Sequence, residues 1–173
     1  MTKYNKVAVL GSNSFSGSHF VNYLLENSDA TVLGISRSPE PAPLFLAYAY
    51  RKERSSRFKF HQLDLNKNLE EIISLLDNEK PEVIVNFAAQ GEVRNSWKWP
   101  EQWYQTNCIS LVGLANQLKD RAYLARFVHI STPEVYGSTA ENIKESNIYH
   151  PTTPYAASRA AGDQFLEMLY KRC

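Results

Sequence analysis

Tyr155 and Arg159 stand four residues apart near the end of the 173-residue sequence. Pro154 suits the first turn of a helix, and residues four apart in a helix share one face. A cation at that spacing favours the phenolate, so Tyr155 could act as a base below the pKa of about 10 of an isolated tyrosine. Oxidation of an alcohol needs such a base, a hydroxyl that orients the substrate and a hydride acceptor. The pair therefore predicts redox chemistry at a hydroxyl-bearing carbon.

The orienting hydroxyl is assigned to Thr132, which follows Ser131 directly after the apolar run at 126–130. A Tyr-x-x-x-cation helix is common by itself. It becomes specific here because a Ser-Thr pair at a strand end, and a phosphate-binding turn earlier in the chain, accompany it.

The phosphate-binding turn is predicted between Gly11 and Gly17, where a short apolar run ends and a helix begins. Backbone amides in such a turn, with the positive end of the helix dipole, can receive a diphosphate. We interpret the turn as dinucleotide-binding through Gly11, Ser14, Phe15 and Gly17, and the alternative is a purely structural turn. The Ser14 hydroxyl either donates to a phosphate or weakens its binding.

A second cofactor contact is expected at Ser36, Arg37 and Ser38, where the second apolar run ends. A carboxylate here would hold the ribose hydroxyls and repel a 2′-phosphate, but no acidic residue of this segment precedes Glu40. A guanidinium and two hydroxyls suit a phosphate. The sequence therefore favours NADP, with NAD possible. The alternative is that Arg37 is a solvated loop charge.

Short apolar runs alternate with longer helical stretches, and these elements must position the groups above. Strands are predicted at 6–10, 30–35, 58–63, 83–87 and 126–130, and helices at 15–27, 69–76, 103–118 and from about 153 onward. This alternation implies right-handed βαβ units. We therefore expect an α/β fold with a doubly wound parallel sheet of the Rossmann type, incomplete at the C-terminus.

Composition limits the partners. The 19 basic and 18 acidic residues give a net charge of +1, which argues against a nucleic-acid binder. The two cysteines cannot build a disulfide framework and suggest a reducing compartment. No apolar run approaches the roughly 18 residues that span a bilayer, so we expect a cytoplasmic protein without membrane contact. The histidines show no metal-ligand spacing, and no metal is expected.

Two clusters carry weaker signals. The basic residues from Arg51 to Lys59 could line a phosphate entrance, although a solvated loop face is the commoner explanation. Trp97, Trp99 and Trp103 could cover a substrate, although packing of a loop on a helix is commoner.

Several segments resemble the extended short-chain dehydrogenase/reductase superfamily. The turn from Gly11 to Gly17 is similar to its Gly-x-x-Gly-x-x-Gly turn, with Ser14 in place of the middle glycine. The resemblance implies further cofactor contacts, namely Asp64 and Leu65 at the adenine, Ala88 and Ala89 after the fourth strand, Asn107, Ser131, Tyr155 and Arg159. The alternative is a helix cap for Asp64 and plain surface polarity for Asn107.

A narrower likeness comes from Ser131–Gly137 and Pro154–Asp163, which look like segments of nucleotide-sugar 4,6-dehydratases of the GDP-mannose and dTDP-glucose types. The resemblance covers essentially the whole chain. It implies that Tyr155 deprotonates the C4 hydroxyl of a nucleotide-diphosphate sugar while hydride passes to NADP⁺. Glu134 then removes the C5 proton, water leaves from C6, and hydride returns to C6 in a redox-neutral lyase reaction.

Three residues depart from that pattern. Arg159 stands where the family has Lys, Pro133 where the dTDP-glucose enzymes have an acid, and Glu92 where relatives often have His. One alternative is a 4-epimerase or reductase of the same family that uses Tyr155 and Thr132 without C5 chemistry. The other is a cofactor-binding module with little or no turnover.

The resemblance also bears on length, because such enzymes run to roughly twice this size. We expect residues 1–173 to be an NAD(P)-binding domain, the truncated N-terminal part of a longer enzyme whose C-terminal substrate region is absent. We expect this chain alone to bind nucleotide weakly and to turn over little or no sugar. The full-length form is expected to be a homodimer.

Overall fold

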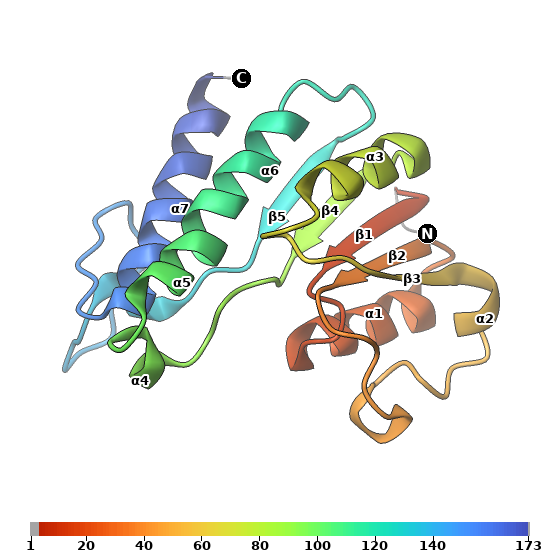
Figure 1. Cartoon of the computed structure of the whole chain (residues 1–173), viewed down its shortest axis with the longest axis horizontal. Coiled ribbons are helices and arrows are strands. Elements are labelled where there is room, and N and C mark those ends of the chain that lie inside the picture. Colours follow the sequence, from red (N-terminus) through yellow and green to blue (C-terminus); the bar gives the residue numbers. More distant parts are fainter. Residues whose placement is uncertain (1–3, 173) are drawn as a thin grey trace. The chain divides into compact units, whose positions relative to one another are not determined.

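A parallel sheet of five strands, in the order β3-β2-β1-β4-β5, forms the centre of the fold (Figure 1). The computed structural model describes residues 4–172, apart from the side chain of Ser55. The strands are β1 (Lys6–Leu10), β2 (Thr31–Ser36), β3 (Phe58–Gln62), β4 (Val83–Asn86) and β5 (Arg126–His129). The order reverses between β1 and β4, which is where doubly wound sheets bind ligands. The predicted Rossmann-type fold is confirmed.

The chain divides into two compact units. The first contains the residues up to Ala88 together with Asp120–Ile130, and therefore all five strands. The second contains Ala89–Lys119 and the residues from Ser131 onward.

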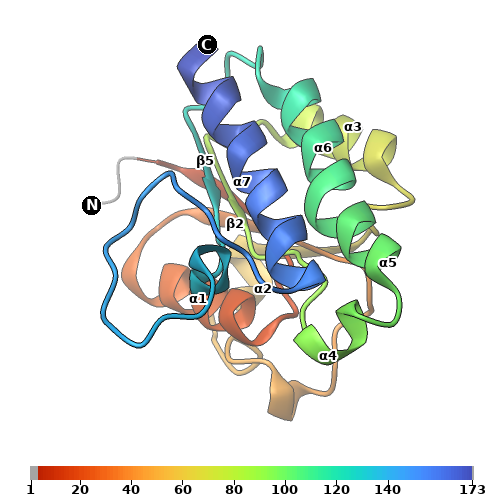
Figure 2. The same ribbon diagram turned by 90° about the vertical axis from the view of Figure 1, so that its left-hand side faces the viewer.

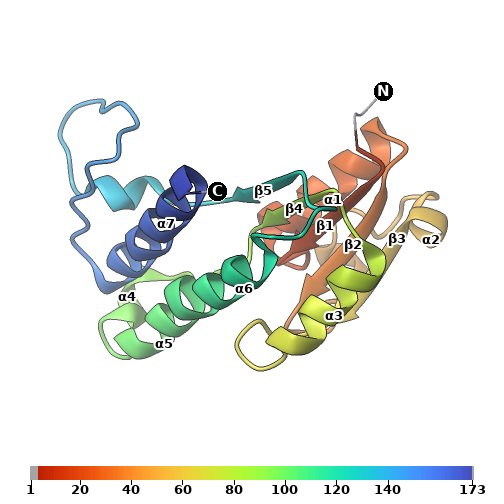
Figure 3. The same cartoon turned by 90° about the horizontal axis from the view of Figure 1, so that it is seen from above.

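Helices cover both faces of the sheet in the first unit, where α1 (Phe15–Asn27) and α3 (Leu69–Glu79) lie on opposite sides (Figure 3). Side chains alternate across a strand, so every second residue faces α1. Val7 and Val9 of β1 accordingly join Leu24 and Leu25 of α1 in one buried cluster. Because both faces are covered, the inner strands β2, β1 and β4 are nearly continuous buried runs, which made them recognisable in the sequence.

The segment between β2 and β3 contains the single-turn helices η1 (Pro43–Phe45) and α2 (Arg54–Arg57). Its basic residues fasten it to α1. Arg51 donates to Asn22 Oδ1 at 2.6 Å, and the Arg57 guanidinium donates to the carbonyl of Leu25 at 2.5 Å, where α1 ends. A cation at a helix C-terminus also complements the dipole. These arginines are therefore engaged in packing.

The second unit is helical, and its helices lie beside one another (Figure 2). They are α4 (Val93–Ser96), α5 (Pro100–Tyr104), the π-helical turn η2 (Gln105–Ser110), α6 (Leu111–Leu118), the 3-10 turn η3 (Pro133–Tyr136) and α7 (Pro154–Arg172). The predicted helix at 103–118 is thus present, but a π-helical turn interrupts it. Helix α7 packs closely on this turn, because a Cβ on Gly162 would lie 2.6 Å from the carbonyl oxygen of Asn107.

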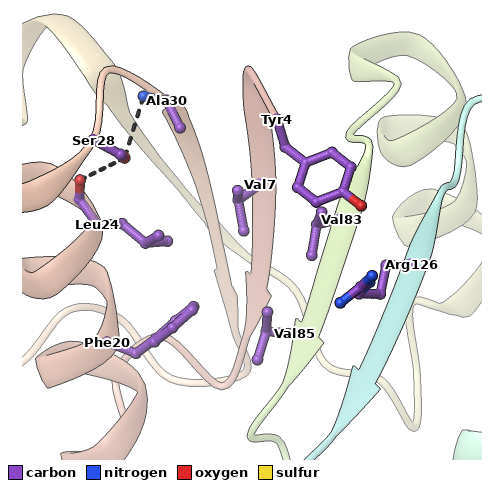
Figure 4. Close-up of a pocket in the computed structure, with 9 residues that line it drawn as sticks. All are labelled: Tyr4, Val7, Phe20, Leu24, Ser28, Ala30, Val83, Val85 and Arg126. Atoms are coloured by element: carbon purple, nitrogen blue, oxygen red, sulfur yellow. Dashed lines mark hydrogen bonds between the residues drawn. The ribbon is translucent and has the colours of Figure 1, made fainter. Parts of the chain in front are cut away.

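A cavity of about 140 Å³ lies between α1 and the amino ends of the strands in the first unit (Figure 4). Its walls are mainly apolar, and Phe20, Val7 and Val85 are among them. The hydroxyl of Ser28, which also lines the cavity, already donates to the carbonyl of Leu24 at 2.7 Å. The cavity lies at the amino ends of the strands, whereas parallel α/β sheets bind ligands at the carboxyl ends.

Candidate functional site

The turn after β1 has the geometry that a diphosphate requires. Gly11 has a φ of +76°, and a Cβ at this position would lie 2.7 Å from the backbone nitrogen of Ala88. A Cβ on Gly17 would lie 2.2 Å from the carbonyl oxygen of Gly11. Both glycines are therefore required by close backbone approach. The first turn of α1, where Ser14, Phe15 and Ser16 are exposed, can present its backbone amides to the diphosphate of a dinucleotide.

Ser14 is the N-cap of α1, and its Oγ accepts a hydrogen bond from the Gly17 nitrogen at 3.0 Å. An accepting hydroxyl oxygen keeps its own hydrogen available for donation. Because Ser14 is exposed, that hydrogen can reach a bound phosphate. Phe15 follows with 81% of its surface exposed and its ring 4.6 Å from the ring of His19. The side chain that replaces the family's middle glycine therefore completes the helix terminus.

The predicted contacts at the end of β2 differ in accessibility. Ser36 is buried, and its Oγ accepts from the Asn13 nitrogen at 3.0 Å. Arg37 and Ser38 are exposed. The Ser36 hydroxyl therefore fastens β2 to the phosphate turn, while Arg37 and Ser38 remain accessible to a ligand.

Asp64 shapes the turn after β3. Its Oδ1 accepts from the Asn66 nitrogen at 2.9 Å, and its carbonyl oxygen accepts from the Asn68 nitrogen at 2.7 Å. The N-cap of α3 is Asn68, so the structure does not support the alternative that Asp64 caps this helix. Leu65 beside it is half-buried.

A buried amide at the last position of β4 holds the backbone that faces Gly11. Asn86 Oδ1 accepts from the Ala88 nitrogen at 3.0 Å, and Asn86 Nδ2 lies 3.1 Å from His129 Nδ1. An amide nitrogen only donates, so Nδ1 of His129 is the acceptor and the imidazole proton is on Nε2. Asn86 and His129 were not predicted as site residues, and their polar types at the carboxyl ends of β4 and β5 were the available signal.

In the second unit, Asn107 is buried and makes three hydrogen bonds. Its Oδ1 accepts from the Gln90 nitrogen at 2.7 Å, and its Nδ2 donates to the Gln90 carbonyl and to Ser158 Oγ, both at 3.0 Å. The alternative of plain surface polarity is therefore wrong. The side-chain amide is engaged in holding the segment after Ala89, which is itself exposed.

Tyr155 stands in the first turn of α7, and two serines fix that turn. Its nitrogen donates to Ser96 Oγ at 3.2 Å, and its carbonyl accepts from Ser158 Oγ at 2.7 Å. Ser96 and Ser158 were not predicted as site residues. Ser158 could have been found from its position within the tyrosine motif, whereas Ser96 lies in a segment without a pattern.

Arg159 lies one helical turn beyond Tyr155 and has only 2% of its surface exposed. Burial lowers the pKa of its guanidinium, and the nearby Tyr155 and Asp163 oppose that shift. Burial raises the pKa of the Asp163 carboxyl, although the hydrogen bond from Ser131 Oγ and the charge of Arg159 act against it. The predicted cation is therefore on the same helix face as Tyr155 and has a carboxylate on its other side.

Thr132 and Glu134 lie together at η3. Thr132 is the N-cap of this turn, and its Oγ1 accepts from the Glu134 nitrogen at 3.3 Å. Its hydroxyl hydrogen can still be donated. Both side chains are half-buried, so each combines partial shielding with access for a ligand.

A model for the GDP-mannose 4,6 dehydratase family matches residues 9–172 of this chain. The chain belongs to this family. A dTDP-glucose 4,6-dehydratase of Haemophilus influenzae is 26% identical over 182 residues, which cover 95% of this chain and 51% of the relative. The chain thus spans about half the length of this curated relative.

Two solved structures are similar in fold. A UDP-glucuronic acid 4-epimerase from Bacillus cereus, in complex with UDP-glucuronic acid and NAD, is 31% identical with a TM-score of 0.81, over 96% of this chain and 52% of that one. A UDP-Glc/GlcNAc 4-epimerase from Campylobacter jejuni is 24% identical with a TM-score of 0.84, over 97% and 50%. The predicted membership of a family of nucleotide-sugar enzymes is confirmed.

Within this dehydratase family, two of the unusual residues have structural explanations. Glu92 has a φ of +68°, and its side chain accepts from the Asn95 nitrogen at 2.9 Å, so it caps α4. Pro133 is the second of these residues, and it occupies the first position of η3.

Trp103 is buried, which agrees with the predicted packing of a loop on a helix, whereas Trp97 is 64% exposed.

No helix among residues 4–172 is long and apolar enough to cross a membrane. The same residues contain no group of three His, Cys, Asp or Glu side chains that could hold a metal ion.

Proposed function

We propose that this chain is the dinucleotide-binding part of a nucleotide-sugar 4,6-dehydratase. The observation that carries the proposal is the joint placement, in the second unit, of a fixed Tyr155 with a buried cation beside it and of Thr132 next to Glu134. Family membership supports the same reaction class. When bound, a nicotinamide cofactor would supply the acceptor for hydride from C4 and later the donor to C6.

Each proposed step has a residue that fits it. Thr132 donates its free hydroxyl hydrogen to the sugar and orients it, and Tyr155 takes the proton of the C4 hydroxyl. Arg159 places a positive charge on the same face of α7 as Tyr155, where the two groups interact electrostatically. Once C4 is a ketone, the C5 proton is acidified and Glu134 removes it. Elimination of the C6 hydroxyl as water follows, and Glu134 is also the proposed donor of the proton that this water needs, because Pro133 cannot supply one.

Replacement of Glu134 by Gln tests this function against its main alternative, a 4-epimerase or reductase. The test uses the longer protein, with nucleotide sugars whose product is scored for loss of water by mass. Glu134→Gln should abolish loss of water, because Gln accepts no proton from C5. The dehydratase proposal fails if the wild type only inverts or reduces C4 and Glu134→Gln leaves that activity intact. The 4-epimerases among the solved structures favour keeping this alternative.

We also propose NADP as the preferred cofactor. Arg37 and Ser38 are exposed where β2 ends, and neither carries a negative charge that would repel a 2′-phosphate. The Bacillus cereus epimerase was solved with NAD, which supports a nicotinamide dinucleotide as the class of cofactor. The preference for a 2′-phosphate is supported by Arg37 alone. Fluorescence titration with NADPH and NADH tests it, and tighter NADH binding would reject it.

A cofactor-binding module without turnover is the third possibility, and the buried Arg159 favours it, because a guanidinium releases no proton to a relay. Arg159→Lys in the longer protein should then raise turnover strongly. For the dehydratase itself we propose a cytoplasmic homodimer, whose molar mass light scattering would measure.

A further inference from the structure

A carboxylate and a guanidinium meet in the segment that follows β2. Glu40 lies just beyond the exposed Arg37 and Ser38, and Arg54 opens α2. Arg54 Nη2 donates to Glu40 Oε1 at 2.8 Å and to Oε2 at 2.6 Å. Only 24% of the Glu40 side chain is exposed. The negative charge of Glu40 is therefore held against a positive charge and directed away from water.

A buried tyrosine holds the same carboxylate from another side. Tyr48 is fully buried, and its hydroxyl donates to Glu40 Oε1 at 2.9 Å. Burial and the adjacent Glu40 raise the pKa of Tyr48 above its ordinary value, so the hydroxyl remains a donor. The guanidinium carbon of Arg54 lies 5.7 Å from the centre of the Tyr48 ring. Glu40, Tyr48 and Arg54 thus form one packed cluster.

This cluster adjoins the phosphate turn through Asn13. The Tyr48 hydroxyl lies 3.5 Å from Asn13 Oδ1, and Asn13 Nδ2 donates to the carbonyls of Ser38 and Pro39, both at 3.0 Å. The Tyr48 hydroxyl therefore lies between the Glu40 carboxylate and Asn13, and Asn13 joins the phosphate turn to the end of β2. The adenosine ribose of a dinucleotide lies at this place in doubly wound folds.

We propose that Glu40 is a masked determinant of cofactor specificity. Arg54 and Tyr48 neutralise and retain its carboxylate, so the end of β2 accepts a 2′-phosphate. A released carboxylate would repel that phosphate and accept hydrogen bonds from ribose hydroxyls, which favours NAD. This inference rests on the proposed use of NADP and adds the residues that set the preference.

The test measures the Kd of NADPH and of NADH by fluorescence titration. Arg54→Gln keeps a donor for Glu40 and removes the positive charge. We expect the Kd of NADPH to rise about ten-fold while that of NADH stays the same or falls, because a phosphate meets an uncompensated negative charge. The double variant Glu40→Gln/Arg54→Gln should restore the wild-type ratio of the two constants.

Arg51→Gln is the matched control, because Arg51 lies in the same segment and pairs with Glu26 of α1 instead. It should leave the ratio unchanged. Tyr48→Phe, which removes one of the two hydrogen bonds to Glu40 Oε1, should shift the ratio in the same direction by a smaller factor, and it serves if Arg54→Gln does not fold. Equal loss of both nucleotides in the folded variants, or no restoration in the double variant, overturns the inference.

The two proposals can fail separately. A wild type that does not prefer NADPH rejects the proposed cofactor. If Arg54→Gln then still moves the ratio toward NADH and the double variant restores it, the specificity role of Glu40 stands. If the wild type prefers NADPH and Arg54→Gln leaves the ratio unchanged, the cofactor proposal stands and the role of Glu40 is rejected.

Discussion

The side-chain amide of Asn107 donates to Ser158 Oγ at 3.0 Å, and Ser158 Oγ donates to the carbonyl of Tyr155 at 2.7 Å. The amide also makes two hydrogen bonds to the backbone of Gln90. One buried side chain therefore connects the loop after β4 to the helix turn that carries the proposed base.

Asn107→Ala should destabilise the protein by about 2–4 kcal/mol, because it removes the two hydrogen bonds to the backbone of Gln90 and the one to Ser158 Oγ from a buried position. Urea unfolding measures the loss. Asn116→Ala, at an exposed position of α6, is the control and should change the free energy of unfolding by less than about 0.5 kcal/mol. An equal effect of the two substitutions would contradict the structural role of Asn107.

Gly11→Ala should abolish nucleotide binding. Its Cβ would lie 2.7 Å from the Ala88 nitrogen, and its φ of +76° favours glycine. We also expect a loss of stability of about 1–3 kcal/mol. The control is Gly91→Ala, since a Cβ on Gly91 would have no neighbour within 4 Å. Titration with NADPH and thermal unfolding check both variants, and an unchanged Kd in Gly11→Ala would be inconsistent with the assigned turn.

Tyr155→Phe removes the proposed base and keeps the ring and the backbone hydrogen bonds of α7. Turnover of the longer protein should fall by about 10²–10⁴-fold, the usual contribution of general base catalysis. Cofactor Kd and the unfolding midpoint should change little. Tyr170→Phe on the same helix, where the side chain is 85% exposed, should retain full turnover. Wild-type rates in Tyr155→Phe would exclude it as the base.

The Asp77 cluster predicts a dependence of stability on pH. The bidentate hydrogen bonds from Arg121, at 2.8 and 3.0 Å, lower the pKa of the Asp77 carboxyl, and the Tyr123 hydroxyl adds to the effect. The unfolded state therefore binds more protons than the folded state between the folded pKa and about 3.9, so stability rises with pH in that window.

Asp77→Asn should therefore lower stability modestly near pH 7 and have a smaller effect as the pH falls below about 4. Urea unfolding from pH 3 to pH 7 measures this difference. Asp120→Asn, at a neighbouring exposed position, is the control. A difference between wild type and Asp77→Asn that does not vary with pH would contradict the linkage.

The sequence predicted elements best where local signals agreed. The helix at 15–27 was predicted to the residue, because a glycine turn and an apolar face mark it together, and the capping side chain of Ser14 confirms the start. The helix at 103–118 was predicted as continuous because apolar spacing does not reveal a change of hydrogen-bond register. Hydrogen bonds between distant residues, such as those of Asn86 with His129 and Tyr155 with Ser96, had no local pattern at all.

Site residues were likewise predictable where their constraint is local and not where it depends on a distant residue. Gly11 and Gly17 were identifiable because their constraint lies in the backbone of one turn. The hydroxyl of Ser36 was predicted to contact the cofactor, and the structure engages it with the Asn13 nitrogen. A polar side chain at a strand end can serve a ligand or a neighbouring turn, and only the three-dimensional arrangement distinguishes the two.

The π-helical turn at Gln105–Ser110 constrains how the length of this chain can vary. Such a turn holds one residue more than the α-helix that it interrupts. Because the six residues of this turn rotate the helix about as far as five α-helical residues would, deleting one residue here would restore an α-helix and keep the flanking segments in nearly the same phase. The buried Trp103 and Leu111 would still face the interior together. A single-residue deletion within 105–110 should therefore preserve the packing of the flanking helices, whereas one within 111–118 should rotate the side chains on its two sides by about 100° relative to each other.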